Sequence, residues 1–299
     1  MTEEPTRRRA GTTEDGARRD RERPPLPEPL PHPVVDNHCH LDIADGPDGD
    51  QWFTTEDAIA AATQVGVPRI VQIGCDLPGA RWAVAAAATY DALVAGVALH
   101  PNEAPRLAAT GDLDAALEEI GRLARAHDKV RAVGETGLDH FRTGPEGRAA
   151  QAESFRRHID LAKRLDKTLV IHDRDAHDEV LEVIDSEGAP ERWVMHCFSG
   201  DVDFAKRCLD RGAYLSFAGT VTFKNAQRLR NALVVVPSDR LLVETDAPYL
   251  TPAPYRGRPN ASYLVPHTMR AMAEVRGDDL EALCVAVSLA TDAAFGGAW

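Results

Sequence analysis

The stretch Val34-Val35-Asp36-Asn37-His38-Cys39-His40-Leu41-Asp42 runs from two β-branched residues directly into a pair of histidines. Side chains on a strand alternate between its two faces, so His38 and His40 point the same way. Two neutral imidazoles placed in this way can bind one divalent metal ion. Taken alone, the pair is also explained as two buried histidines with ordinary hydrogen bonds. The metal interpretation therefore requires further ligand-type residues at the same position of later strands.

Short β-branched runs alternate with longer helical patterns from Val34 onward. The predicted strands are Val34–Asp42, Arg69–Cys75, Ala92–His100, Val130–Asp139, Thr168–Arg174, Arg192–Phe198, Ala213–Gly219 and Arg240–Asp246. The predicted helices are Asp57–Val65, Asp112–His127, Gly147–Leu165, a segment marked by Val180 and Ile184, Pro266–Val275 and Asp278–Ala294. Eight strands alternating with helices over about 265 residues are typical of the α/β fold called the (β/α)8 or TIM barrel.

The alternative architecture is an open, doubly wound sheet, which commonly carries Gly-x-Gly-x-x-Gly after its first strand. That motif does not follow Val34–Asp42 here. An open sheet would also gather ligand-type residues near one crevice, whereas here they end strands throughout the chain. We therefore favour the barrel.

Residues 1–33 differ in composition from the predicted barrel domain, residues 34–299. This tail holds seven Arg and seven acidic residues, and it closes on a proline-rich run. With so few apolar residues it cannot offset the entropy lost on ordering, so we expect it to be disordered. No apolar run follows its arginines, so we expect no export signal in it.

Charge and cysteine content limit the classes of partner. A formal net charge of −13 argues against broad binding to a nucleic-acid backbone, although bound cations would reverse the sign inside a cleft. No apolar run approaches the roughly 20 residues that span a bilayer, so we expect no membrane partner. The five cysteines are odd in number and form no Cys-x-x-Cys pair, which indicates reduced thiols and a cytoplasmic location. We expect a monomer.

Imidazoles and carboxylates end most of the predicted strands, where a barrel places its reactive groups. In chain order these residues are His38, His40, His100, Glu135, His172, His196 and Asp246. Such a set suits two ions of zinc, manganese, iron or magnesium in a hydrolytic site. Glu135, between Gly134 and Gly137, is the candidate bridge between the ions, and Asp246 is the candidate ligand and general base.

Neighbouring residues are given supporting roles. For Glu244 we favour a role in supporting a ligand or in the barrel core over direct metal binding. We expect Asp42 to orient an imidazole and Cys39 and Cys197 to pack in the core. Binding of a substrate phosphate would need guanidinium groups that donate two parallel hydrogen bonds, or neutral or titratable donors, near the rim. The candidates are His100, Asn102, His140, Arg142, Arg174, Arg256 and Arg258. Any one of these is also explained as a solvated surface group.

With these blocks collected, the chain resembles the TatD family of metal-dependent deoxyribonucleases. The matching blocks are Asp36-Asn37-His38-Cys39-His40-Leu41-Asp42, Gly134-Glu135-Thr136-Gly137-Leu138-Asp139, His172-Asp173-Arg174-Asp175-Ala176, His196-Cys197-Phe198-Ser199-Gly200, Glu244-Thr245-Asp246-Ala247-Pro248-Tyr249-Leu250 and Arg256-Gly257-Arg258-Pro259-Asn260. The resemblance spans nearly all of residues 34–299 and leaves the tail outside.

The resemblance implies a barrel of the metal-dependent amidohydrolase type that hydrolyses phosphodiester bonds in DNA, often from a 3′ end, on single-stranded or frayed substrate. It implies one metal on His38, His40, Glu135 and Asp246, and a second on Glu135, His172 and His196. The ions would be Mg, Mn or Zn. This chain departs from the family pattern at Asn102, at Ala261-Ser262 and at His140-Phe141, all outside the implied ligands.

Three hypotheses follow from the residues. The first is a two-metal deoxyribonuclease in which Asp246 takes a proton from the attacking water. The second is a metal-dependent esterase or deacylase, acting for example on an aminoacyl-tRNA ester or a lactone, because the same site can polarise a carbonyl oxygen. The third is a non-catalytic barrel that keeps its metals for stability.

Overall fold

A computed structural model describes residues 4–12, 19–45 and 53–299, and its centre is a ring of eight parallel strands. The strands are β2 (Val35–Cys39), β4 (Arg69–Gly74), β5 (Leu93–Val97), β6 (Val130–Asp139), β7 (Thr168–Arg174), β8 (Trp193–Met195), β9 (Tyr214–Phe217) and β10 (Leu241–Val243). Each is hydrogen-bonded to the next in chain order. The eight strands expected from the sequence are therefore present. β6 and β7 have the predicted bounds, and the other six are shorter than predicted.

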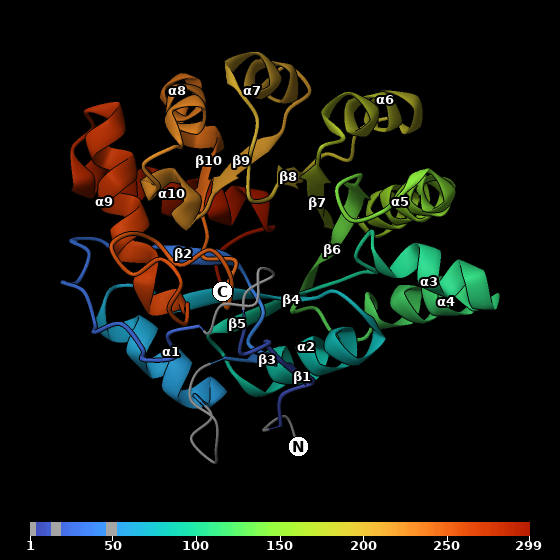
Figure 1. Ribbon diagram of the computed structural model, residues 1–299, viewed down its shortest axis with the longest axis horizontal. Coiled ribbons are helices and arrows are strands. Elements are labelled where there is room, and N and C mark those ends of the chain that lie inside the picture. Colours follow the sequence, from blue (N-terminus) through green and yellow to red (C-terminus); the bar gives the residue numbers. More distant parts are fainter. Residues whose placement is uncertain (1–3, 13–18, 46–52) are drawn as a thin grey trace.

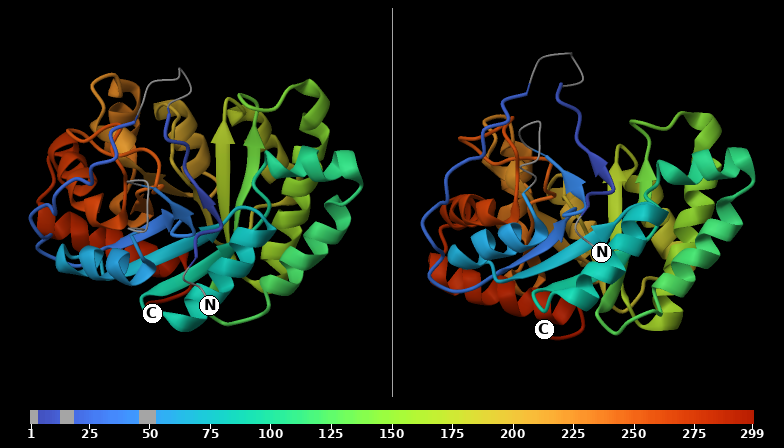
Figure 2. Two further views of the ribbon diagram at one scale, coloured as in Figure 1. Left: turned by 60° about the horizontal axis from the view of Figure 1, so that its bottom comes forward. Right: turned by 90° about the horizontal axis from the view of Figure 1, so that it is seen from below.

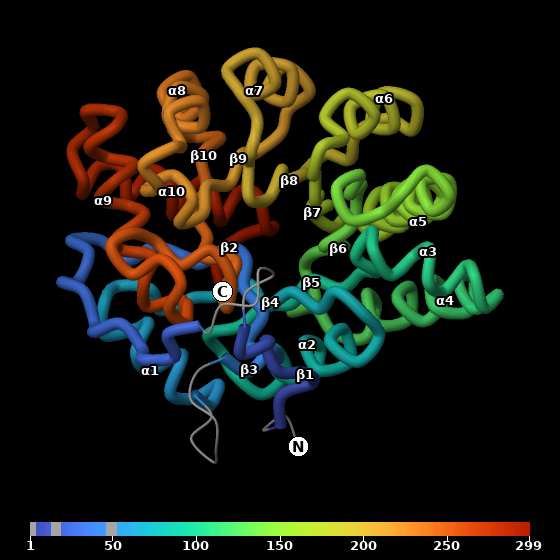
Figure 3. Tube along the Cα trace, viewed as in Figure 1, coloured from blue at the N-terminus to red at the C-terminus, as the bar shows by residue number. Residues whose placement is uncertain are grey.

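Helices cover the outside of the ring (Figure 1). They are α1 (Thr55–Gln64), α2 (Leu77–Thr89), α3 (Glu103–Thr110), α4 (Leu113–Leu123), α5 (Pro145–Leu165), α6 (His177–Glu187), α7 (Val202–Leu209), α8 (Gln227–Val235), α9 (Val265–Arg276) and α10 (Leu280–Ala294). The helical patterns in the sequence correspond to α1, α4, α5, α6, α9 and α10. The tube trace in Figure 3 follows the same alternation of strand and helix around the ring. The fold is a TIM barrel, as predicted.

The ring closes between its first and last strands through the segment that follows β10. Cys39 and Ala247 form a parallel bridge, and the backbone N–H of Asp246 donates to the carbonyl of His38 at 2.9 Å. The N–H of His40 donates to the carbonyl of Ala247 at 2.7 Å. Two ligand candidates from opposite ends of the chain are thus brought together by the backbone itself.

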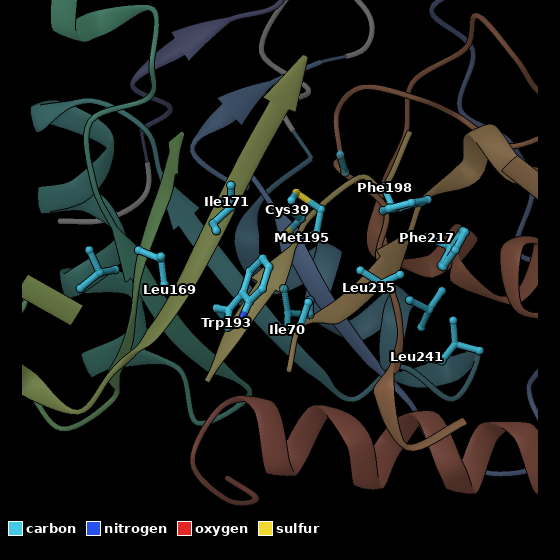
Figure 4. Close-up of a cluster of buried hydrophobic side chains, with 14 of the residues drawn as sticks. Cys39, Ile70, Leu169, Ile171, Trp193, Met195, Phe198, Leu215, Phe217 and Leu241 are labelled. Carbon is cyan, nitrogen blue, oxygen red and sulfur yellow. The ribbon is translucent and has the colours of Figure 1, made fainter. Parts of the chain in front are cut away.

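Apolar side chains fill the space between the strands and the helices. Trp193, Met195, Leu215 and Phe217 belong to this layer on the last strands and are buried (Figure 4). A separate cluster joins strand residues such as Val35 and Val170 to Phe295 at the end of α10. The hydroxyl of Thr168, where β7 starts, donates to the carbonyl of Ala294 at 2.5 Å. The end of α10 therefore covers the amino-terminal ends of the strands and leaves their carboxyl ends for the site.

Part of the tail lies on the barrel. Arg7–Arg8 forms a short strand, β1, that pairs in parallel with β3 (Ile43–Ala44). Farther along, the Tyr263 hydroxyl donates to the carbonyl of Pro24 at 2.7 Å, and Leu30 is buried. No pattern in the sequence predicted this pairing. Disorder of residues 1–33 in solution stays a prediction.

No helix in the described part of the chain is long and apolar enough to cross a membrane.

Candidate metal centre

His38 lies at the bottom of the site and is completely buried in β2. Neither of its ring nitrogens has a hydrogen-bond partner among the residues that the structure describes. Its Nε2 atom is 3.5 Å from Glu135 Oε2 and 3.9 Å from Asp246 Oδ1. Burying an imidazole without a hydrogen-bond partner costs free energy. A cation between His38 Nε2 and the two carboxylate oxygens would give that nitrogen a partner.

His40 follows β2 and faces the same space. Its Nδ1 lies 2.9 Å from the carbonyl oxygen of Ile73, a contact that fixes the ring with Nε2 toward the site. This Nε2 is 3.4 Å from Asp246 Oδ1 and 4.0 Å from Glu135 Oε2. Asp246 has a backbone φ of 54°, a conformation that an aspartate can adopt and that turns the chain sharply away from β10.

Glu135 is the centre of the cluster and is buried on β6. Its Oε1 atom is 2.6 Å from His172 Nδ1, 2.9 Å from His196 Nε2 and 3.6 Å from His100 Nε2. Its Oε2 atom faces His38 and His40. One carboxylate therefore lies between two groups of imidazoles, with one oxygen toward each.

The charges in this cluster depend strongly on one another. Burial alone would raise the pKa of the Glu135 carboxyl, but the imidazoles of His196 and His100 hold that pKa well below its ordinary value. Burial lowers the pKa of His196, yet the Glu135 and Glu244 carboxylates outweigh it and raise that pKa well above normal. Burial, together with the charge of His196, lowers the pKa of His38. His38 is therefore neutral, as a metal ligand must be.

Glu244 supports His196 from behind. Glu244 is fully buried, and its Oε1 lies 3.0 Å from His196 Nδ1 and accepts the Cys197 backbone N–H at 2.9 Å. Its Oε2 accepts the Ser216 hydroxyl at 2.5 Å. A carboxylate on the far nitrogen of an imidazole fixes the ring with its other nitrogen toward the site. This contact is the supporting role that the sequence favoured for Glu244.

Two neighbouring residues differ from expectation. Asp42 was expected to orient an imidazole, but it accepts hydrogen bonds from Gln72 Nε2 at 2.8 Å and from Thr6 Oγ1 at 2.7 Å. Cys39 is buried as expected, whereas Cys197 is only partly buried.

Two site residues were missed by the sequence reasoning. The Cys75 thiol donates to Glu135 Oε2 at 3.2 Å, and Asp139 Oδ2 is 3.4 Å from His172 Nε2. Cys75 directly follows β4 and Asp139 ends β6, so their position at strand ends was the available signal.

Groups of potential ligand atoms overlap in this space. Each group has its atoms within 4.8 Å of one another, and the groups are His38, Glu135 and His196; His38, His40 and Asp246; His40, Cys75 and Glu135; and His100, Glu135 and His172. All the metal-ligand candidates from the sequence belong to them. The arrangement can hold divalent cations with imidazole and carboxylate donors, a set typical of zinc and manganese.

The substrate candidates are distributed around the rim. His100 is beside Glu135, and Asn102 Nδ2 donates to Asp139 Oδ2 at 3.2 Å. Asn102 and Arg142 also line a hollow of about 580 Å³ between α3 and the start of α5. Asn102 is thus connected to His172 through Asp139, whose Oδ2 is 3.4 Å from His172 Nε2.

The other candidates have partners of their own. His140 Nε2 is 3.3 Å from Glu179 Oε2, and the Arg174 guanidinium lies 3.9 Å from the centre of the Phe141 ring. The Arg256 guanidinium lies 4.3 Å from the centre of the Phe223 ring. Arg258 forms ion pairs with Asp20 and Glu22 of the tail. Roles in substrate binding stay predictions for all of these residues.

Comparisons with known proteins agree with this geometry. Residues 35–296 match the family model described as TatD related DNase. A Mycobacterium tuberculosis protein named uncharacterized metal-dependent hydrolase TatD is 43% identical over 270 residues, which are 89% of this chain and 99% of that protein. The uncharacterized metal-dependent hydrolase YabD of Bacillus subtilis is 37% identical over 81% of this chain and 91% of its own. The crystal structure of YJJV, a TatD homolog from Escherichia coli, superposes with a TM-score of 0.79 at 28% identity and covers 89% of this chain and 98% of its own.

Proposed function

Because this chain belongs to the family of TatD related DNases and is a metal-dependent hydrolase, we propose that it is a deoxyribonuclease that removes nucleotides from DNA 3′ ends. We further propose that it uses two divalent ions. One would be held by His38, His40, Glu135 and Asp246, and the other by Glu135, His172 and His196. Glu135 would then be a ligand of both ions.

The observation that supports this most strongly is the unpartnered His38 ring. It is fully buried and faces two carboxylates across gaps of 3.5 and 3.9 Å, which are too long for hydrogen bonds. A structural histidine would have a direct partner at this depth. A bound cation would supply the missing partner for His38 Nε2 and would offset the two negative charges beside it.

Divalent ions in such a site lower the pKa of water and polarise a phosphoryl oxygen. In this proposal Asp246 would take the proton from the attacking water. Its side chain is 15% exposed, whereas that of His38 is 0% exposed, so Asp246 reaches the open side of the cluster. Its pKa is held below normal by His40 and His196 against the effect of burial, so it is ionised at neutral pH and able to accept a proton.

Substrate would enter along the rim between β5 and β7. His100 has a side chain 20% exposed and a pKa lowered to about 3 by burial, so it is neutral and able to donate one hydrogen bond to a non-bridging oxygen. Arg174, stacked on the exposed ring of Phe141, offers a fixed cation above the site. Asn102 and the hollow that it shares with Arg142 would hold the neighbouring nucleotide.

The test is release of nucleotides from a single-stranded oligonucleotide with added Mg, Mn or Zn. The wild-type chain should release them from the 3′ end, and an Asp246→Ala variant should be slower by about 10²- to 10⁴-fold. The melting temperature of both chains should be measured in parallel, to exclude unfolding. Equal release by the wild type and the variant would contradict the proposal.

The ester alternative is tested in the same experiment. Under one metal condition, an aminoacyl-tRNA ester and a lactone are offered beside the oligonucleotide. Cleavage of a carboxylic ester with no release of nucleotides would replace the deoxyribonuclease by an esterase at the same residues.

A further inference from the structure

The strap, which we define as residues 4–12, is a part of the tail that lies beside the metal centre. Its strand β1 pairs with β3 in the register Arg7 to Ile43 and Arg8 to Ala44, and β3 begins three residues after His40. The Thr6 N–H donates to the Asp42 carbonyl at 2.8 Å. Figure 2 shows this segment next to the carboxyl ends of the barrel strands. The strap therefore lies along one side of the opening at the carboxyl ends of the barrel strands.

Arg9 anchors the strap to both sides of the opening. Its side chain is 12% exposed and pairs with Asp45 Oδ2 at 3.0 Å. It also donates to the carbonyl of Pro248 and lies 5.1 Å from the centre of the Tyr249 ring. Pro248 and Tyr249 follow the ligand candidate Asp246 directly in the chain. The anchor thus connects the loop after β2 to the loop after β10.

Arg7 lies on the same face of the strap as Arg9, because alternate residues of a strand share a face. Its guanidinium is 3.6 Å from Asp76 Oδ2, and its side chain is 44% exposed. Burial lowers the pKa of Arg7, but Cys75, Tyr249 and Asp76 outweigh this effect and raise that pKa. Cys75 in turn touches Glu135. Arg7 is therefore a half-exposed cation paired with Asp76, the residue that follows Cys75 in the chain.

The contact between Arg7 and Asp76 is weak enough for the guanidinium to bind another anion. An ion pair of this length and exposure contributes little, about 0–1 kcal/mol. The other oxygen of Asp76 already accepts the Gly79 N–H at 2.7 Å, at the start of α2. A phosphate dianion or diester could take both forks of the guanidinium with much better geometry.

We propose that the strap is a wall of the substrate site and that Arg7 binds a phosphate group of the DNA next to the bond that is cleaved. This inference rests on the proposed function and adds a substrate contact to it. The family model begins at residue 35, so the strap is an addition to the part of the chain that matches it. In a chain with a net charge of −13, such a local cation adds to the attraction that bound metal ions would give for a polyanion.

The experiment compares the variants Arg7→Gln, Arg8→Gln and Arg9→Gln in the full-length, metal-loaded chain. Arg8 is a matched control, because it is exposed on the same strand and lies on its opposite face. Nucleotide release is measured against the concentration of a single-stranded oligonucleotide at several KCl concentrations. This yields KM, kcat and the salt dependence for each variant, and melting temperatures are recorded in parallel.

Arg7→Gln should raise KM about tenfold, as expected for one lost hydrogen-bonded charge, and should leave kcat within about twofold. The slope of log affinity against log salt should also fall by about 0.7, the value for one phosphate contact on a single strand. Arg9→Gln should give the same change by releasing the strap, and Arg8→Gln should resemble the wild type. A merely structural strap would change stability without changing the salt slope.

Two results would overturn the proposal while the proposed function stands. One is equal KM in Arg7→Gln and Arg8→Gln, and the other is faster turnover in Arg9→Gln, which would make the strap an inhibitory cover. If the wild type releases no nucleotides, the proposed function fails instead. The role of Arg7 in phosphate binding is then tested by calorimetric titration with inorganic phosphate. Equal affinity for phosphate in Arg7→Gln and Arg8→Gln would overturn that role, and weaker affinity in Arg7→Gln alone would support it.

Discussion

Replacing Glu244 by Gln should weaken metal binding without displacing any ligand. Glu244 Oε1 lies between His196 Nδ1 and the Cys197 N–H, and Oε2 accepts from Ser216. A Gln side chain can keep these contacts, because its oxygen still accepts from His196 and Cys197 while its amide donates to the Ser216 oxygen. The substitution therefore removes the negative charge and keeps the geometry of His196.

The magnitude follows from the kind of hydrogen bond that is changed. A hydrogen bond to a charged group contributes about 1.5–3 kcal/mol, roughly twice the value of a neutral one. Loss of the charge alone should then reduce the free energy of metal binding by about 1.4 kcal/mol, which raises the dissociation constant of the metal tenfold. Glu244→Ala loses the whole contact and leaves the Cys197 N–H without its acceptor, so its effect should approach about 100-fold.

The assay is a calorimetric titration of metal-free protein with Mn²⁺ or Zn²⁺ in a metal buffer. Glu179→Gln is the matched control, since Glu179 also pairs with a histidine, His140, but at the rim and with its side chain 40% exposed. The expected order of affinity is wild type equal to Glu179→Gln, then Glu244→Gln, then Glu244→Ala. Undiminished affinity in Glu244→Ala would refute the supporting role of Glu244 and the assignment of His196 as a ligand.

Other consequences of the same structure can be measured separately. Removing the metal with a chelator should abolish hydrolysis and lower the melting temperature, because a metal at 100 times its dissociation constant stabilises the fold by about 2.7 kcal/mol; an unchanged melting temperature would argue against ions in this buried site. Cys75→Ala should weaken metal binding less than Glu244→Gln, since a thiol is a weak donor to Glu135, and a larger effect in the same titration would make Cys75 a ligand. Burial lowers the pKa of His158 from 6.5 to about 4, so between these values the unfolded chain binds more protons, and stability present above pH 6.5 is lost as the pH falls to about 4. His158→Gln should flatten this loss by about 3 kcal/mol in denaturant unfolding, and parallel pH profiles for both chains would contradict it.

Some features of the site could be predicted from the sequence because they are local. A β-branched run that ends in His38 and His40 fixes which face both imidazoles share, whatever the rest of the chain does. The same reasoning applied to Glu135, His172 and Asp246 at the ends of later strands, because parallel strands in a barrel present their carboxyl ends at one rim. Residue type and strand position were sufficient for the ligand candidates.

The partners of these residues could not be predicted in the same way. Asp42 accepts hydrogen bonds from Gln72 and Thr6 rather than from an imidazole. The Cys75 thiol, which follows β4, donates to Glu135 on β6, although β5 lies between these two strands. Such pairs depend on the register between strands and on rotamers, which no short stretch of sequence specifies. The strap is the clearest example, since an Arg-rich tail with few apolar residues has the composition of a disordered segment.

The sequence by itself determined the alternation of strand and helix and the chemical nature of the groups at each strand end, since both depend on side chains a few residues apart. His38 and Asp246 are more than 200 positions apart in the chain. Only the tertiary structure decided that His38 Nε2 lies 3.9 Å from Asp246 Oδ1. That distance results from closure of the ring, in which the backbone of His38 accepts the Asp246 N–H. Closure is a property of all the strands together, and so is the space for metal at their centre.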